Sequence, residues 1–196
     1  YTGAMTLSGN SVLLASGDGA VISTSGAVNS DSTPRALTMS ATGANGSVVF
    51  NHAIGSTAAL ASLSTTGSEI VLNGPTVNTT GNQTYAGSVR LASNTTLTGA
   101  NVATTQGSVV VGAGNSVGIV GNASLGGVVN NVSQFSVSGT TQLAGNVSST
   151  GNQTYTGAIT LGGDSALLAN GTNAVITTSG ACLLYTSDAA DEGLGV

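Results

Sequence analysis

The sequence has very few charged residues. Only 5% of its 196 residues are Asp, Glu, Lys or Arg, where about 25% is usual. The two basic residues are both arginines, Arg35 and Arg90. Nucleic acids and anionic membranes are bound through basic patches that displace counterions. The composition therefore argues against both kinds of partner.

Aromatic residues and long apolar runs are also scarce. Aromatics make up 3% of the chain and tryptophan is absent. Disordered chains also contain few aromatic residues, but they are poor in Val, Ile and Leu as well. This chain is 40% hydrophobic, which argues against disorder. No apolar run approaches the roughly 18 residues of a membrane-spanning helix, so no transmembrane segment is predicted. The apolar residues come in short alternating runs, which favour many short strands.

The single cysteine, Cys182, belongs to a segment unlike the rest of the chain. Residues 182–192 read CLLYTSDAADE and contain three of the seven acidic residues. This stretch resembles a translated sequencing-adapter sequence. We therefore predict that residues 1–181 are a repeat segment from a longer chain and that residues 182–196 are an artefactual tail.

Internal repeats dominate the remainder of the sequence. The hexapeptide TGNQTY occurs at residues 80–85 and again at 150–155. Residues 1–27 align with residues 155–181 with identity at 19 of 27 positions. A looser middle copy starts at Tyr85, so the copies begin at Tyr1, Tyr85 and Tyr155. The second interval between copies is shorter than the first.

A shorter rhythm runs inside this period. Alternating apolar runs occur near Val21, Val48, Ile70, Val89, Val109, Phe135, Ile159 and Val175. Their spacing varies, from the long step between Val21 and Val48 to the short one between Ile159 and Val175. We interpret each run as one coil of a solenoid with corners of variable length. The predicted fold is all-β, a right-handed parallel β-helix of roughly nine coils, in which Asn or Thr side chains form ladders between coils.

Strand alternation assigns a direction to the side chains of the repeat. Tyr85, Gly87, Val89 and Leu91 share one face, and Arg90 on the other face must meet solvent, so the tyrosines are predicted to point inward. Each glycine is expected to leave room beside a tyrosine ring, and each asparagine to occupy a turn that tolerates a left-handed backbone. The structural repeat positions are Tyr1, Gly3, Asn82, Tyr85, Gly87, Asn152, Tyr155 and Gly157.

Chemistry-bearing residues are sparse. Residues 1–181 hold four carboxylates, Asp18, Asp31, Glu69 and Asp164, and acid–base catalysis requires such groups to cluster. His52 has no neighbour at metal-ligand spacing, so a turn or surface position is expected. We assign no catalytic, cofactor-binding or metal-binding residues, and we expect no enzyme activity in this segment.

The stretches TGNQTYAGSVRL, TGNQTYTGAITL and ALASLSTTGSEIVLNGPTVNTTGNQTY resemble the repeat region of filamentous-haemagglutinin-like bacterial surface adhesins, and the resemblance covers nearly all of residues 1–181. It implies a β-helical shaft that is exported by a partner transporter of the outer membrane or as an autotransporter. The implied location is extracellular or the cell surface. The implied roles are adhesion, aggregation and biofilm formation, with host-cell or surface glycans or proteins, or further copies of the chain, as partners.

Two other functions stay open. One is an ice-binding or carbohydrate-binding secreted β-helix, which requires rows of outward threonines such as Thr154 and Thr160, and the variable coil spacing weakens it. The other is a polysaccharide-active β-helical enzyme, which the scarcity of carboxylates disfavours.

Overall fold

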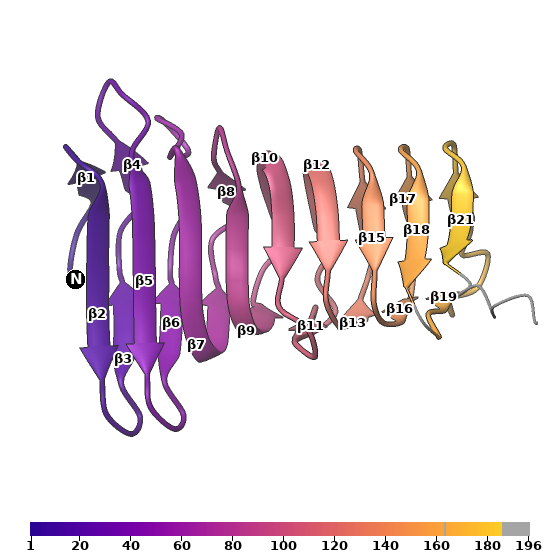
Figure 1. Cartoon of the computed structure of the whole chain (residues 1–196), viewed down its shortest axis with the longest axis horizontal. Coiled ribbons are helices and arrows are strands. Elements are labelled where there is room, and N and C mark those ends of the chain that lie inside the picture. Colours follow the sequence, from indigo (N-terminus) through magenta and orange to yellow (C-terminus); the bar gives the residue numbers. More distant parts are fainter. Residues whose placement is uncertain (163, 186–196) are drawn as a thin grey trace, which may run out of the picture.

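The structure is a computed structural model that describes residues 1–162 and 164–185. Throughout these residues the chain forms β-strands joined by short corners, with no helix. Successive strands wind around one axis, and every strand pairing is parallel and joins segments one turn apart, as Figure 1 shows. A front strand runs down, the following strand returns behind it, and the path advances along the axis, which makes the coil right-handed (Figure 1). The predicted right-handed parallel β-helix is confirmed.

Three stacks of strands, here called faces A, B and C, line the coil. Face A contains β2 (Ser11–Ser16), β5 (Ala36–Thr42), the first parts of β7 (Ser62–Leu72) and β9 (Gln83–Leu91), the last parts of β10 (Thr95–Thr104) and β12 (Val117–Leu125), and β15 (Thr141–Leu143), β18 (Ile159–Gly162) and β21 (Cys182–Tyr185). Face B contains β3 (Val21–Thr24), β6 (Ser47–Phe50), the last parts of β7 and β9, and β11 (Val109–Val111), β13 (Val128–Val132), β16 (Val147–Ser149) and β19 (Leu167–Ala169). Face C contains β1 (Met5–Leu7), β4 (Val28–Ser30), a bridge at Ile54, β8 (Thr76–Asn78), the first parts of β10 and β12, and β14 (Phe135–Val137), β17 (Gln153–Tyr155) and β20 (Ile176–Thr178).

The coils shorten from the N-terminal end to the middle of the chain and lengthen again in the last described coil. Hydrogen bonds between neighbouring coils join Asn10 to Ala36, a separation of 26 positions, but Asn122 to Thr140, a separation of only 18. The stack makes about eight turns, one fewer than expected. Figure 1 shows longer strands in the N-terminal coils than in the middle of the rod. Corner and strand length therefore vary while the stacking on each face continues.

Inward side chains form a single apolar core along the axis. Each inward column is filled by residues in register, such as Ile70, Val89 and Val110 on face B. Tyr85 and Tyr155 are buried, with 1% and 0% of their surface exposed, so their predicted inward direction is confirmed. Tyr1 is the exception, because at 64% exposure it lies outside the core.

The interpretation of every apolar run as one coil is only partly correct. The first five runs, from Val21 to Val109, all lie on face B, one turn apart. The next run, at Phe135, lies on face C, and the run at Ile159 lies on face A. Face B itself continues through Val129 and Val147. Residue spacing alone cannot distinguish these cases. The number of residues in a short coil plus one further strand is nearly the same as the number in one long coil.

The predicted boundary after residue 181 falls immediately before β21. Residues Cys182–Tyr185 pair with Ile159–Gly162 of β18 and so continue face A. The remainder of the predicted tail, residues 186–196, lies outside the described residues.

Candidate functional site: the glutamine–tyrosine corners and the outer faces

Gln83 sits fully buried at the corner where the chain enters face A. Its Nε2 donates hydrogen bonds to the carbonyl oxygens of Val77 at 3.1 Å and Thr98 at 2.8 Å, and to Thr79 Oγ1 at 3.3 Å. Its Oε1 accepts a hydrogen bond of 2.8 Å from the Tyr85 hydroxyl. The side chain thereby joins the preceding strand, its own strand and the next coil along the chain.

Gln153 repeats this network atom for atom. Its Nε2 donates to the carbonyl oxygens of Val147 at 3.2 Å and Leu168 at 2.8 Å, and to Ser149 Oγ at 3.1 Å. The Tyr155 hydroxyl donates to Gln153 Oε1 at 2.9 Å. Each partner stands at the same separation from its glutamine in both copies, with serine in place of threonine at one position.

This network explains why the glutamine and the tyrosine of the hexapeptide recur unchanged. A buried carboxamide or phenol that lacks hydrogen bonds destabilises a fold, whereas a satisfied one specifies a single packing. Burial also raises the pKa of both Tyr85 and Tyr155 well above the ordinary value for a phenol. The tyrosines therefore serve as neutral hydrogen-bond donors.

Sequence reasoning did not identify the glutamines. The signal was present, because the alternation that turns Tyr85 inward also turns Gln83 inward. An inward glutamine two residues before an inward tyrosine, repeated with the same spacing, is a pattern that predicts such a pair. The partner hydroxyls, Thr79 and Ser149, precede each glutamine by four positions.

Asn82 and Asn152 lie at corners immediately before β9 and β17, as predicted. Neither has a positive φ, so the left-handed backbone that asparagine tolerates is not used at these two corners. Asn152 contributes through its side chain, because its Oδ1 accepts a hydrogen bond of 3.0 Å from the backbone N–H of Val175 in the next coil. Other asparagines cap the next coil in the same way: Asn10, Asn29, Asn94, Asn122 and Asn146.

The predicted ladders are present as well. The Asn73 Nδ2 donates a 2.7 Å hydrogen bond to Asn51 Oδ1 in the preceding coil, and Asn51 in turn donates to the carbonyl oxygen of Thr24. Three coils are thus linked at one corner. Side-chain amides here support backbone pairing between coils.

The repeated glycines make room for backbone and not for tyrosine rings. A Cβ on Gly87, whose φ is +147°, would collide with the carbonyl oxygen of Gly67 in the coil before it. A Cβ on Gly157 would collide with the backbone of Gly139. The predicted space beside the ring is therefore wrong, and close approach of adjacent coils is the reason for glycine. Gly3 differs, since a Cβ there meets nothing within 4 Å, although its φ is +92°.

The three sequence copies lie on three different faces. The strand that follows the starting tyrosine is on face C at Met5, on face B at Val89 and on face A at Ile159. Ten strand segments separate the first two: β2 to β6, the bridge at Ile54, both parts of β7, β8 and the first part of β9. Ten also separate the second pair: both parts of β10, β11, both parts of β12, and β13 to β17. Each copy is therefore the eleventh segment after its predecessor, although the two intervals differ in their number of residues.

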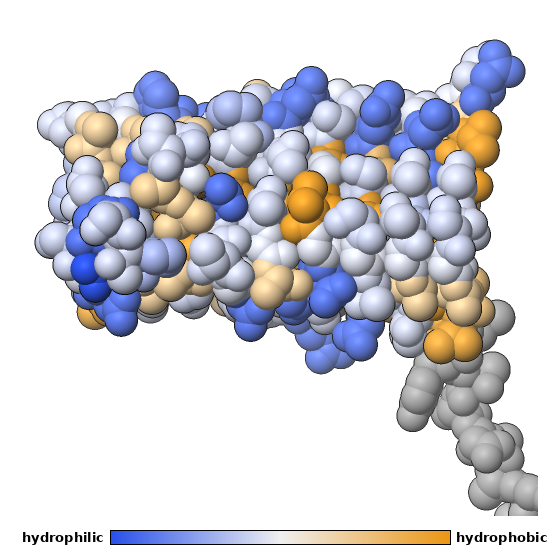
Figure 2. All heavy atoms as spheres, turned by 90° about the horizontal axis from the view of Figure 1, so that it is seen from above, coloured by the Kyte–Doolittle hydropathy of each residue, from blue (hydrophilic) through white to orange (hydrophobic). Residues whose placement is uncertain are grey.

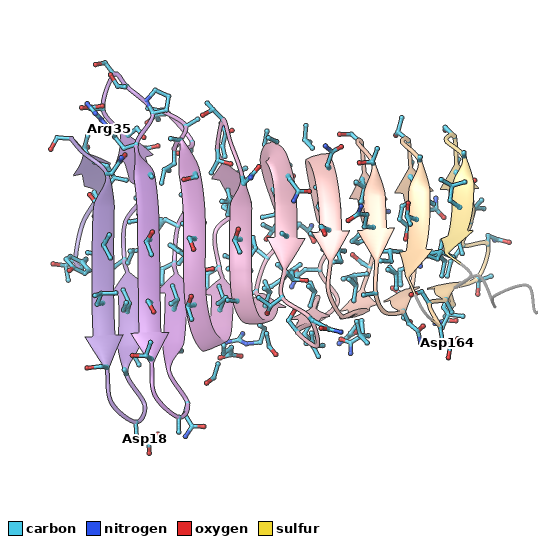
Figure 3. All side chains as sticks on the ribbon, in the orientation of Figure 1. Asp18, Arg35 and Asp164 are labelled. Atoms are coloured by element: carbon cyan, nitrogen blue, oxygen red, sulfur yellow. The ribbon has the colours of Figure 1, made fainter. Side chains whose placement is uncertain are left out.

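Charged groups in the described residues are dispersed over the surface. Arg35 makes a bidentate pair with Asp31, with contacts of 3.0 and 2.9 Å, and Arg90 pairs with Glu69 at 2.9 Å. In Figure 3, Asp18 and Arg35 lie at opposite edges of the N-terminal coils, and Asp164 lies near the other end. Arg90 is exposed, as predicted.

Groups that could bind a metal do not come together in the described part of the chain. No three His, Cys, Asp or Glu side chains gather there, and His52 is exposed at a bend after β6, as expected. No helix in this part is long and apolar enough to cross a membrane. The arrangement offers structural polar contacts and no assembled acid–base group among these residues.

The outer faces carry columns of hydroxyl groups. Thr154 and Thr160 do not form the expected row, because they lie on faces C and A. On face A, however, three hydroxyl residues stack in register, namely Thr38, Ser64 and Thr84. A second column beside it contains Ser40 and Thr66.

Face C has its own hydroxyl column, from Thr76 and Thr96 to Ser136 and Thr154. Gly118 interrupts it, and a polar hollow of about 330 Å³ lies there. The side of the molecule seen in Figure 2 is mostly pale to blue, with several apolar patches.

Comparisons with protein-family models, with curated proteins and with solved structures found no match.

Proposed function

We propose that this chain is a structural shaft segment of a large secreted or surface-anchored bacterial adhesin, serving adhesion, aggregation or biofilm formation without catalysis in this segment. The observation that carries the proposal is the repeated buried corner in a continuous parallel stack. A β-helix grows by adding coils, and each new coil buries apolar surface against its neighbour. The product of that growth is length, which is the property that a shaft supplies.

The surface supports the same proposal. Hydroxyl side chains form outward columns on faces A and C, and both arginines are paired with carboxylates. A surface with few charges allows rods to lie close to one another or to neutral glycans with little charge repulsion. Weak contacts repeated along a rod then add up through multivalency. The proposed partners are surface glycans or proteins and further copies of the chain, and the proposed location is the cell surface.

The shaft proposal is tested by changing the number of repeats. The chain is inserted between a bacterial surface anchor and a fluorescent tip, and a matched version carries residues 85–154 twice. The distance from tip to membrane is measured by energy transfer to a membrane dye. Each added unit should extend the rod by about 18 Å, because it adds eleven thirds of a turn at about 4.8 Å per turn. An unchanged distance would refute a shaft.

A second candidate, a flat-face binder of ice or of a neutral carbohydrate, gains one specific observation. Variable coil length was the argument against it, but face A keeps its register from Thr38 through Ser64 to Thr84 although the coils shorten. The extra residues lie outside these columns. Ser64→Lys with Thr66→Lys should abolish any inhibition of ice recrystallisation, whereas Thr154→Lys on face C should not. Absence of inhibition by the unaltered chain would remove ice as the ligand of this face.

A further inference from the structure

The interval between copies of the repeat is constant when it is measured in strand segments, but it varies when it is measured in residues. The interval from Tyr85 to Tyr155 contains fewer residues than the interval from Tyr1 to Tyr85, yet each advances the chain by eleven strand segments. The N-terminal coils are longer than the middle ones, as the pairings of Leu37 with Leu63 and of Thr141 with Ile159 show. Insertions in coils thus change the residue count and leave the strand count intact.

Eleven segments on a three-faced rod do not complete a whole number of turns. Each interval equals three turns and two further faces, so equivalent residues are displaced by one face at every copy. Thr6, Arg90 and Thr160 occupy the same position in the three copies, directly after Met5, Val89 and Ile159. They point outward from faces C, B and A respectively.

The buried corner makes this displacement physically possible. Gln83 bonds to the preceding strand through Val77 and to the next coil through Thr98. Gln153 makes the same bonds through Val147 and Leu168 at a different corner. The network requires only the local corner and the next coil along the chain. It therefore forms both at the corner that leads into face A and at the corner that leads into face C.

We propose that the eleven-strand period is a rotational display device, which turns each copy of the repeat by a third of a circle so that equivalent outward side chains point to all three sides of the rod. The fourth copy of such an array would return to the face of the first. A planar surface meets one face at a time and can contact only every third copy. A partner that contacts every copy must surround the rod, as a mesh or a bundle does.

The test measures distances between spin labels in the full chain, with Cys182→Ser as the background. One variant carries labels at Arg90→Cys and Thr160→Cys, which occupy equivalent positions in consecutive copies. The matched control carries labels at Thr84→Cys and Thr160→Cys, which lie on the same face, four coils apart. Unfolding by urea and far-ultraviolet circular dichroism establish that each variant is folded.

The control distance should be about 19 Å, which is four coil spacings. Arg90 lies a third of a turn closer to Thr160 along the axis, so copies on one face would give a shorter distance than the control. The rotational display predicts the opposite order, with the Arg90–Thr160 distance longer by at least about 5 Å because it crosses the rod. A distance equal to or shorter than the control overturns the proposal.

A second pair keeps the test decisive if loss of the Arg90 side chain disturbs the fold. Ser88 points outward on face B two residues before Arg90 and carries no charge. Ser88→Cys with Thr160→Cys should reproduce the longer distance. The result is independent of the adhesin proposal, since it depends on the geometry of the rod and not on a ligand.

Discussion

The Tyr85 hydroxyl donates a hydrogen bond of 2.8 Å to Gln83 Oε1, two residues earlier on the same strand. Both side chains point into the core, which is unusual for two polar groups. The pair recurs with the same partners at Tyr155 and Gln153. The recurrence of this glutamine and this tyrosine is therefore explained by the hydrogen bonds that they need when buried, in which the outward Thr84 and Thr154 do not participate.

Gln83→Leu should destabilise the chain by about 2–3 kcal/mol. The substitution removes the acceptor of the Tyr85 hydroxyl and the donor to the carbonyl oxygens of Val77 and Thr98, so buried polar groups lose their partners. Urea unfolding measures the effect. Thr84→Ala, on the exposed side of the same strand, should change stability by less than about 0.5 kcal/mol.

Adding Tyr85→Phe to Gln83→Leu should cost less than the sum of the single substitutions, because the double variant leaves no unsatisfied phenol. Additive free energies in this cycle would contradict a direct Tyr85–Gln83 interaction.

Gly87→Ala should destabilise the chain by at least about 2 kcal/mol. Its φ of +147° is strained for any other residue, and a Cβ would collide with the carbonyl oxygen of Gly67. Gly9→Ala is the matched control, since a Cβ there meets nothing within 4 Å and the φ is not positive. Thermal unfolding followed by circular dichroism compares the two, and equal effects would disprove the close-approach explanation.

Stability should decrease as the pH rises above 10. Burial raises the pKa of Tyr85 and Tyr155 above the value of 10.0 that an exposed phenol has. Their contribution is fully present below pH 10 and declines above it, because only the unfolded chain then releases the phenolic protons. The linkage slope is about 1.4 kcal/mol per pH unit for each tyrosine.

Urea midpoints measured between pH 8 and 11.5 give that slope. In the double variant Tyr85→Phe with Tyr155→Phe the tyrosine-linked part of the slope should disappear. Tyrosinate absorbance from these two residues in the native protein at pH 11 would contradict the prediction.

The carboxyl group of Asp31 should titrate below its ordinary pKa of 3.8. The hydrogen bonds from the Arg35 side chain, together with one from the Thr33 backbone, favour its charged form. Nuclear magnetic resonance titration of the carboxyl carbon measures this pKa. Arg35→Gln should raise it toward 3.8, whereas Arg90→Gln should leave it unchanged because Arg90 pairs with Glu69.

Alternation in short stretches of sequence identified the correct class of structure. It placed Tyr85, Val89 and Leu91 inside and Arg90 outside, and all four positions are confirmed. The inward glutamines follow from the same alternation but were not recognised, because glutamine is ordinarily a surface residue. The sequence predicted a tyrosine ring beside each glycine. The atom that a Cβ on Gly87 would meet is instead the carbonyl oxygen of Gly67 in another coil.

The sequence by itself determined the strands, their inward and outward sides and the existence of a repeat, because these depend on alternation between adjacent residues and on identity between copies. Only the tertiary structure decided which strands stack on one another. Coil lengths that fall from 26 to 18 positions make residue spacing an unreliable measure of rotation, while backbone pairing between coils fixes each segment to one face. The eleven-strand period and the placement of the three copies on three faces arise at that level, where interstrand hydrogen bonds set the register.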